Sequence, residues 1–271
     1  MYYLTVFCVG MLLNQETVLE TTRLFMVPYL HTHVVKYHQW MENPQLREST
    51  SSDLLSLDEE LDAQQKWCNS DDRLTFILLS KKLIQEYWLS GSVQNEIDTS
   101  SRLSVYETLD NANPEVFAMI GDVNLFLTPG GDNGFEGELS VMIAEPDFRG
   151  QGLAAEALAG ITEYSGRHLS IKLTSLVAKV SINNKESMHF FKNRLQFVER
   201  SRNSIFNEVE LVPQVQLNLS AEDELLKSIN LSLKTSEFIV NRLLMTSSEF
   251  AASGWYYQEN DFTIWRQEIR K

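Results

Sequence analysis

Hydrophobic and polar residues alternate between Glu138 and Ala144, and a second pattern of different period follows. Leu139, Val141 and Ile143 fall on one face of the first segment, which is typical of a β-strand. Beyond a short polar turn, hydrophobic residues return at helical spacing, at Leu153, Ala157, Leu158 and Ile161. The sequence therefore predicts a strand, a turn and a helix in direct succession.

Similar patterns predict an α/β fold along most of the chain. The expected strands are residues 23–30, 73–79, 116–127, 138–144, 173–180, 196–201 and 206–217. One expected helix covers His33 to Met41, and a capping box at Ser56 and Glu59 predicts a second that runs to about Trp67. Turn-forming residues from Thr128 to Gly134 predict a hairpin between two of the strands.

Three segments differ from this pattern. Residues 90–114 are rich in Ser, Asn, Asp and Thr without a sustained period, so we expect a long polar loop. Residues 1–10 are apolar without a basic side chain, which favours an upstream extension or an alternative start at Met11 over a signal peptide. The spacing of hydrophobic residues in 220–271 predicts a mainly helical extension. Its aromatic tail should pack on the domain or on a protein partner.

Composition narrows the class of function. The chain has 271 residues, 43% of them hydrophobic, which is enough for one core and an appendage. Lys and Arg number 23 against 37 Asp and Glu, a formal net charge of −14, which argues against nucleic acid as a partner because its phosphates would be repelled. This charge would attract a cationic amine substrate, although solubility alone also explains an acidic surface.

Cysteine and histidine usage points away from disulfides and metals. Cys8 and Cys68 are too few for a disulfide framework or a thiolate cluster, so we expect a reducing compartment, the cytoplasm or the nucleus. His31 and His33 lack a third ligand in a plausible motif, so we expect no metal. Since no segment approaches about 18 uninterrupted apolar residues, we expect no membrane span.

The turn between the Glu138 strand and the following helix predicts an anion-binding site. It contains Arg149-Gly150-Gln151-Gly152-Leu153-Ala154. Its two glycines let a ligand approach the backbone, and the first turn of a helix leaves amide hydrogens without intrahelical partners. The helix dipole adds partial positive charge there, so a phosphate or diphosphate is the expected ligand. The sequence matches neither the P-loop pattern nor the dinucleotide-binding GxGxxG pattern.

This hexapeptide resembles the Arg/Gln-x-x-Gly-x-Gly/Ala signature of the GCN5-related N-acetyltransferase (GNAT) superfamily. A second resemblance follows in Asn184-Lys-Glu-Ser187, which looks like the later family motif that opens a helix. Further segments are similar to the N-acetyltransferase 9-like branch, including Glu138 to Pro146 and Tyr37-His-Gln-Trp-Met41. The resemblance covers residues 11–219 and implies the GNAT fold, a mixed twisted sheet of about seven strands flanked by helices.

Two departures from the family pattern concern the helix after Asn184. Gln196 stands where the family has glycine, and the stretch from Asn184 to Phe197 is one residue longer than usual. Phe191 occupies the position at which many relatives have a tyrosine that can protonate the departing thiolate of coenzyme A. The end of this helix therefore has no firm prediction.

The resemblance also implies the residues of the site. Strand amides around Ile143 and Glu145 would hold the pantetheine arm, the glycine turn the diphosphate, and Asn184 with Ser187 would position the cofactor. The implied cofactor-binding residues are Met142, Ile143, Ala144, Glu145, Arg149, Gly150, Gln151, Gly152, Leu153, Ala154, Asn184 and Ser187. Helix capping explains Asn184 and Ser187 equally well.

Acetyl transfer requires an amine to lose a proton before it attacks the thioester. An α-amino group has a pKa of about 7.7 to 8.0 and a lysine about 10.4, so a base helps the lysine more. Glu138 lies where relatives often place a glutamate, and we predict it as the base, with Glu136 as the reserve candidate. An exposed carboxylate at a strand edge is the structural alternative for Glu138.

The sequence thus predicts an acetyl-CoA-dependent N-acetyltransferase that acts on a primary amine of a protein or peptide, at an N-terminus or a lysine. One alternative is a catalytically weak or inactive GNAT-fold scaffold that binds a protein partner. The other is a small-amine acetyltransferase.

Overall fold

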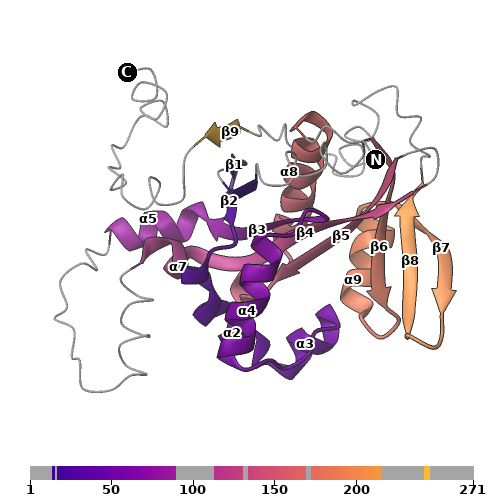
Figure 1. The fold of residues 1–271 in the computed structure, drawn as a ribbon, viewed down its shortest axis with the longest axis horizontal. Coiled ribbons are helices and arrows are strands. Elements are labelled where there is room, and N and C mark those ends of the chain that lie inside the picture. Colours follow the sequence, from indigo (N-terminus) through magenta and orange to yellow (C-terminus); the bar gives the residue numbers. More distant parts are fainter. Residues whose placement is uncertain are drawn as a thin grey trace.

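A computed structural model describes residues 14–15, 17–89, 113–130, 134–168, 172–214 and 241–244. In these ranges nine strands form one sheet in the order β7-β8-β6-β5-β4-β3-β2-β1-β9 (Figure 1). The strands are β1 (Thr17–Glu20), β2 (Leu24–Pro28), β3 (Arg73–Ser80), β4 (Met119–Pro129), β5 (Phe135–Ile143), β6 (Leu173–Ser181), β7 (Phe197–Asn203), β8 (Glu208–Pro213) and β9 (Asn241–Leu244). All neighbouring strands run antiparallel except β5 and β6, which are parallel.

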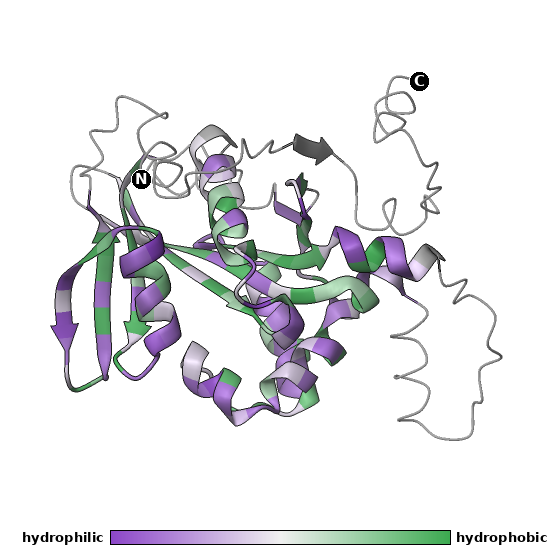
Figure 2. Cartoon of the chain, turned by 180° about the vertical axis from the view of Figure 1, so that it is seen from behind, coloured by the Kyte–Doolittle hydropathy of each residue, from purple (hydrophilic) through white to green (hydrophobic). Residues whose placement is uncertain are grey.

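Helices cover both faces of this sheet. They are α2 (Val34–Met41), α3 (Pro44–Thr50), α4 (Leu57–Cys68), α5 (Lys81–Leu89), α7 (Pro114–Ala118), α8 (Leu153–His168) and α9 (Lys185–His189). On one face α8 packs against β2, β4 and β5, with Tyr164 1% exposed and edge-on to Phe76. On the other face α2 and its neighbours cover a second hydrophobic cluster that includes Tyr37, Ile77 and Met142. Hydrophobic residues accordingly concentrate in the central strands, whereas the edge strand β7 is largely hydrophilic (Figure 2).

The parallel strands β5 and β6 separate halfway along their length. Their register runs only from Phe135 to Glu138, where Glu138 lies opposite Val177. Beyond that point β5 continues beside β4 as far as Ile143, while β6 pairs with β8 from Ala178 to Ser181. The sheet therefore opens between the two strands, and β6 and β8 turn away from β5 in Figure 1. We call this feature the β5–β6 opening.

Most predicted elements occur close to their expected positions. The Ser56 capping box is confirmed, since Ser56 Oγ accepts from the Glu59 amide at 3.4 Å and Glu59 Oε2 accepts from the Ser56 amide at 2.8 Å. The hairpin between β4 and β5 is also confirmed. Helix α3, helix α5 and strand β1 had no prediction.

The predicted start of the third strand, at residue 116, is wrong. Residues 114–118 form α7, and β4 begins only at Met119. Asn113 caps this helix by accepting from the Glu115 amide at 2.9 Å, and Pro114 occupies its first turn. Asn followed by Pro is a helix-start signal that the hydrophobic pattern of the strand obscured.

The helix after Asn184 ends in a π-helical turn, Phe190–Arg194. Such a turn accommodates one extra residue within a helix, which explains how the longer spacing of this chain fits the fold. Gln196 then adopts a φ of 57°, the left-handed conformation that glycine tolerates best. Phe191 is 5% exposed and packs against Phe190 and Phe197 in the core.

Several predicted segments lie outside the described residues. These are the extension at residues 1–10 with Cys8, the polar loop apart from residues 113–114, and most of residues 220–271 including the aromatic tail. Residues 241–244 of the C-terminal extension form a strand instead of a helix, and β9 pairs with β1.

Candidate active site

The turn that was predicted to bind an anion lies directly after β5. Residues Pro146–Phe148 form a short 3-10 helix, and Arg149 to Gly152 then lead into α8. Gly150 and Gly152 have φ values of 71° and 81°, a region that side chains with a Cβ rarely adopt. A Cβ atom on Gly150 would have no atom within 4 Å, so glycine is needed there for the backbone conformation and not for space. We call residues 149–152 the glycine turn.

Arg149 fixes this turn to the end of β5. Its Nε donates to the Ile143 carbonyl at 2.8 Å and its Nη2 to the Ala144 carbonyl at 2.7 Å. The guanidinium is thus directed at backbone oxygens of the protein. The predicted site residue Arg149 therefore has a visible structural function in shaping the turn.

A second arginine holds the turn from the other side. Arg23, just before β2, donates from Nε to Glu156 Oε2 at 2.7 Å and from Nη1 to the Gln151 carbonyl at 2.7 Å. Glu156 lies in the first turn of α8 with no exposed surface, and it also accepts from Thr21 Oγ1 at 2.6 Å and the Arg23 amide at 2.7 Å. Sequence reasoning missed this group, because Thr21 and Arg23 are more than 120 residues from Gln151 and Glu156 in the chain.

The outer half of β5 presents main-chain groups to the β5–β6 opening. The Ala144 amide donates to the Ile120 carbonyl of β4 at 2.8 Å. Since hydrogen-bonding direction alternates along an antiparallel strand, the Met142 amide also faces β4, whereas those of Val141 and Ile143 face the opening. The Ile143 amide therefore faces the opening, and its contact with the cofactor stays a prediction.

Glu145, also predicted to bind the cofactor, directs its amide at β4 and its carboxylate at α2. Its amide donates to the Ile120 carbonyl at 3.3 Å, so it points into the sheet. Its carboxylate accepts from Trp40 Nε1 at 2.9 Å and lies 3.5 Å from Lys36 Nζ. Both contacts join the end of β5 to α2, because the chain bends at this residue after the strand ends at Ile143.

Asn184 and Ser187 form the N-terminal cap of α9. Asn184 Oδ1 accepts from the Ser187 amide at 2.9 Å, which is the capping alternative to their predicted role. Asn184 Nδ2 also donates to the Ser49 carbonyl of α3 at 3.3 Å. This bond joins α9, which follows β6, to α3, which packs against α2.

Glu138, the predicted base, is the last residue of β5 in register with β6 and so lies where the opening begins. Its Oε2 is 2.6 Å from Lys179 Nζ. The reserve candidate Glu136 binds Arg200 through both carboxylate oxygens and accepts from Ser175 Oγ at 2.8 Å. The Arg200 hydrogen bonds lower the pKa of Glu136 and make it a weaker proton acceptor than an unpaired carboxylate.

Asp122 on β4 is a buried carboxyl group that sequence reasoning missed. It is 3% exposed, lies opposite Met142 and accepts from Asn124 Nδ2 at 2.6 Å. Burial raises the pKa of Asp122 to about 7, against the opposing effect of the Asn124 hydrogen bond. The sequence offered one signal for this buried group, namely the two polar residues Asp122 and Asn124 in an otherwise apolar strand.

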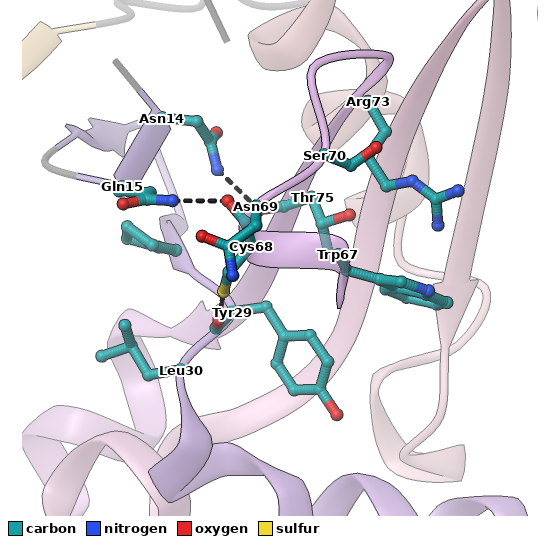
Figure 3. Close-up of a pocket in the computed structure, with 11 residues that line it drawn as sticks. Asn14, Gln15, Tyr29, Leu30, Trp67, Cys68, Asn69, Ser70, Arg73 and Thr75 are labelled. Carbon is teal, nitrogen blue, oxygen red and sulfur yellow. Dashed lines mark hydrogen bonds between the residues drawn. The ribbon is translucent and has the colours of Figure 1, made fainter. Parts of the chain in front are cut away.

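One cavity of about 350 Å³ lies elsewhere, at the end of β2 beside β3 and α4 (Figure 3). Its lining includes Tyr29, Trp67 and Thr75, and a hydrogen bond of 3.0 Å from Asn14 to the Thr75 carbonyl borders it. Cys68, a free thiol, donates to the Tyr29 carbonyl at 3.1 Å. Because none of the predicted site residues lines this cavity, it is separate from the opening.

Comparison with known proteins identifies the class that this geometry defines. The Acetyltransferase (GNAT) domain family matches residues 23–193. "Alpha/beta-tubulin-N-acetyltransferase 9" of Drosophila melanogaster is 37% identical over 200 residues, 73% of this chain and 87% of that protein. "N-acetyltransferase 9-like protein" of Nematostella vectensis is 36% identical over 201 residues, 74% of this chain and 87% of that protein.

Among solved structures, spermidine N-acetyltransferase from Vibrio cholerae in complex with CoA and spermine is 16% identical, with a TM-score of 0.49. The likeness covers 70% of this chain and 94% of that one. The family match and the two relatives show that the chain belongs to the GNAT acetyltransferases and, within them, to the N-acetyltransferase 9-like branch. It is an acetyl-CoA-dependent N-acetyltransferase.

The described residues fit this cosubstrate. Gly150 leaves open space at the turn, and the Ile143 amide faces the opening that leads to it. Within the described ranges, no three His, Cys, Asp or Glu side chains are grouped so that they could hold a metal ion. In the same part of the chain, every helix is too short or too polar to cross a membrane.

Proposed function

We propose that acetyl-CoA binds in the β5–β6 opening and that the acetyl group passes to an amine of a protein or peptide. The observation that carries the proposal is the separation of β5 from β6 directly before the glycine turn. An extended ligand can enter between the strands and place its anionic end at the turn. The Val141 and Ile143 amides then act as hydrogen-bond donors along its path.

In this arrangement the main chain recognises the coenzyme. Residues Gly150 to Ala154 supply amide hydrogens at the positive end of α8, which suits a diphosphate. Ile143 offers an amide to the pantetheine arm or to the oxygen that gains negative charge when the thioester is attacked. Arg149 acts indirectly by holding the carbonyls of Ile143 and Ala144, and thereby keeps the strand end and the turn in place.

Glu138 is the proposed base, directly or through one water molecule. Its carboxylate lies at the start of the opening, on the same face of the sheet as the Lys179 ammonium that pairs with it. The proton leaves the acceptor nitrogen for a Glu138 carboxylate oxygen. Glu136 remains the reserve candidate, although its pairing with Arg200 makes it less suitable.

One observation supports a protein amine as the acceptor, and a second supports a cationic amine of either kind. The relatives from Drosophila melanogaster, Mus musculus and Homo sapiens bear names that specify tubulin as the substrate, and they are 36–37% identical to this chain. The chain also carries a formal charge of −14, which favours a cationic amine near the opening.

The test supplies the full chain with labelled acetyl-CoA and three acceptors. These are a peptide with a free N-terminus and no lysine, an N-blocked peptide with one lysine, and spermidine. We expect label on at least one peptide, and mass spectrometry of the product would distinguish the N-terminus from lysine. Label on spermidine with none on either peptide would overturn the protein-amine assignment.

A further inference from the structure

Glu156 poses an electrostatic problem for a phosphate site at the glycine turn. Its carboxylate lies in the first turn of α8 with no exposed surface, close to the amides that would meet the phosphate. A negative charge there interacts favourably with the helix dipole in the free protein. It would also repel a second anion at the same helix end unless a cation lies between them.

Arg23 lies in that place. Its Nε and Nη1 are held by Glu156 and by the Gln151 carbonyl at 2.7 Å each. The nearest atom to a Cβ built on Gly152 is Arg23 Nη2, at 3.6 Å. The guanidinium therefore lies against the glycine turn, between the buried carboxylate and the backbone that would receive the ligand.

The Arg23 side chain remains 45% exposed in spite of these bonds, whereas its partner Glu156 is fully enclosed. A guanidinium has five N–H donors in a fixed plane, and the Nη2 group lies on the side of Gly152. Since Nε and Nη1 are already fixed, binding an anion through Nη2 costs little additional side-chain entropy. Arg149 differs, because its Nε and Nη2 are directed at the carbonyls of Ile143 and Ala144.

We propose that Arg23 is a phosphate-binding residue of the coenzyme site and donates to the diphosphate through Nη2. This inference rests on the proposed position of the coenzyme at the glycine turn. Arg23 then has two functions. It neutralises Glu156, and its Nη2 group adds a charge-assisted side-chain donor to the backbone amides of the turn.

The test compares ligands with and without a diphosphate. In Arg23→Gln, affinity for coenzyme A measured by titration calorimetry should fall by about 10- to 100-fold, the range for losing a hydrogen bond to a charged group. The KM for S-acetylpantetheine, which has no diphosphate, should stay unchanged in the acetyl-transfer assay. Arg202→Gln is the matched control, since this arginine of β7 is 49% exposed and pairs with Glu199. It should bind both ligands as the unaltered chain does.

Loss of Arg23 also leaves Glu156 buried without its cation, which can destabilise the fold. The double variant Arg23→Gln with Glu156→Gln removes both charges and keeps hydrogen-bonding groups at both positions. We expect it to unfold at a higher temperature than Arg23→Gln alone and to recover only part of the affinity for coenzyme A, because the repulsion by Glu156 is removed but the Nη2 donor is not restored. Recovery of full affinity in the double variant would overturn the proposal and leave Arg23 only a structural function.

An equal loss for coenzyme A and S-acetylpantetheine in Arg23→Gln would also overturn it, because that result means general damage to the site. Unchanged affinity of Arg23→Gln for both ligands would overturn the proposal as well. If the unaltered chain gives no binding heat with coenzyme A, the proposed function itself fails, and that outcome is separate from any effect of Arg23.

Discussion

Gly150 and Gly152 combine two properties that few other residues offer at the end of a strand. Their positive φ values turn the chain sharply from β5 into α8, and the absence of side chains leaves the backbone amides accessible. Two arginines from different parts of the sequence hold this conformation, Arg149 from within the turn and Arg23 from the edge of β2. The turn is therefore shaped before a ligand arrives.

Gly152→Glu should abolish measurable coenzyme affinity while the domain stays folded. The substitution places a carboxylate beside the proposed diphosphate position, and the positive φ adds about 1 to 2 kcal/mol of backbone strain. Titration with desulfo-CoA measures the affinity, and circular dichroism checks the fold. Gly166→Glu is the control, since Gly166 in α8 has open space around it and no positive φ. Unchanged affinity in Gly152→Glu would place the coenzyme elsewhere.

Glu138→Gln should lower kcat by about 10²- to 10⁴-fold, the contribution typical of a general base, with a smaller effect on coenzyme binding. The acidic limb of the pH–rate profile should disappear with the carboxylate. Glu199→Gln is a suitable control, because Glu199 is also paired with basic residues, Lys192 and Arg202, but lies on the edge strand β7. A pH–rate profile identical to that of the unaltered chain would exclude Glu138 as the base.

At the scale of elements, signals within a few residues determine where helices begin. The capping box of α4 is one such signal, with reciprocal bonds between Ser56 and Glu59. Asn43 and Asn113 cap α3 and α7 in a similar way, each followed by proline.

Ser56→Ala should therefore destabilise the protein by about 0.5 to 2 kcal/mol, because the Glu59 amide loses its acceptor. Urea denaturation followed by circular dichroism measures the change in the free energy of unfolding. Ser204→Ala, in the exposed turn between β7 and β8, should change it by less than about 0.5 kcal/mol. Equal effects of the two substitutions would show that the cap contributes nothing specific.

The elements that the sequence predicted well are those whose cause is local. The alternation in β5, the α4 cap and the glycine turn each depend on neighbours within about one turn or strand, and all three occur as expected. The π-helical turn at Phe190–Arg194 has no comparable local signal, and only the extra residue before Phe197 indicated an irregularity. The pairing of Arg23 with Glu156 could not be predicted, because it depends on how β2 and α8 meet in space.

At the scale of the whole molecule, the two faces of the sheet differ in polarity. The face under α8 is apolar and includes Phe76 and Leu139. The other face carries charged and polar side chains among its hydrophobic ones, including Asp122 and Glu138. Asp122 is enclosed there with one hydrogen bond from Asn124, so its protonation depends on the pH at which the protein is kept.

The raised pKa of Asp122 makes stability depend on pH in a defined direction. Its pKa is about 7 in the folded protein and 3.8 as the ordinary value, so between these pH values the folded state holds a proton that the unfolded state has lost. The stabilising contribution is complete below pH 3.8 and disappears as the pH rises through about 7. Asp122→Asn should therefore gain stability relative to the unaltered chain as pH rises from about 4 to 8, by on the order of 4 kcal/mol.

Thermal unfolding at several pH values measures this effect. Ser204→Ala, an exposed substitution that removes no titratable group, is the control and should give a constant difference. A constant difference for Asp122→Asn as well would mean that Asp122 ionises at its ordinary pKa.

The parallel ladder between β5 and β6 extends only from Phe135 to Glu138, so this seam connects two parts of the sheet at one end. Beyond it, β5 belongs with β4 on one side and β6 with β8 on the other. A ligand bound between β5 and β6 contacts both parts of the sheet and stabilises their short connection. Substrate binding should then make the sheet more rigid at this seam. Amide hydrogen exchange should become slower there, also in residues that do not contact the ligand.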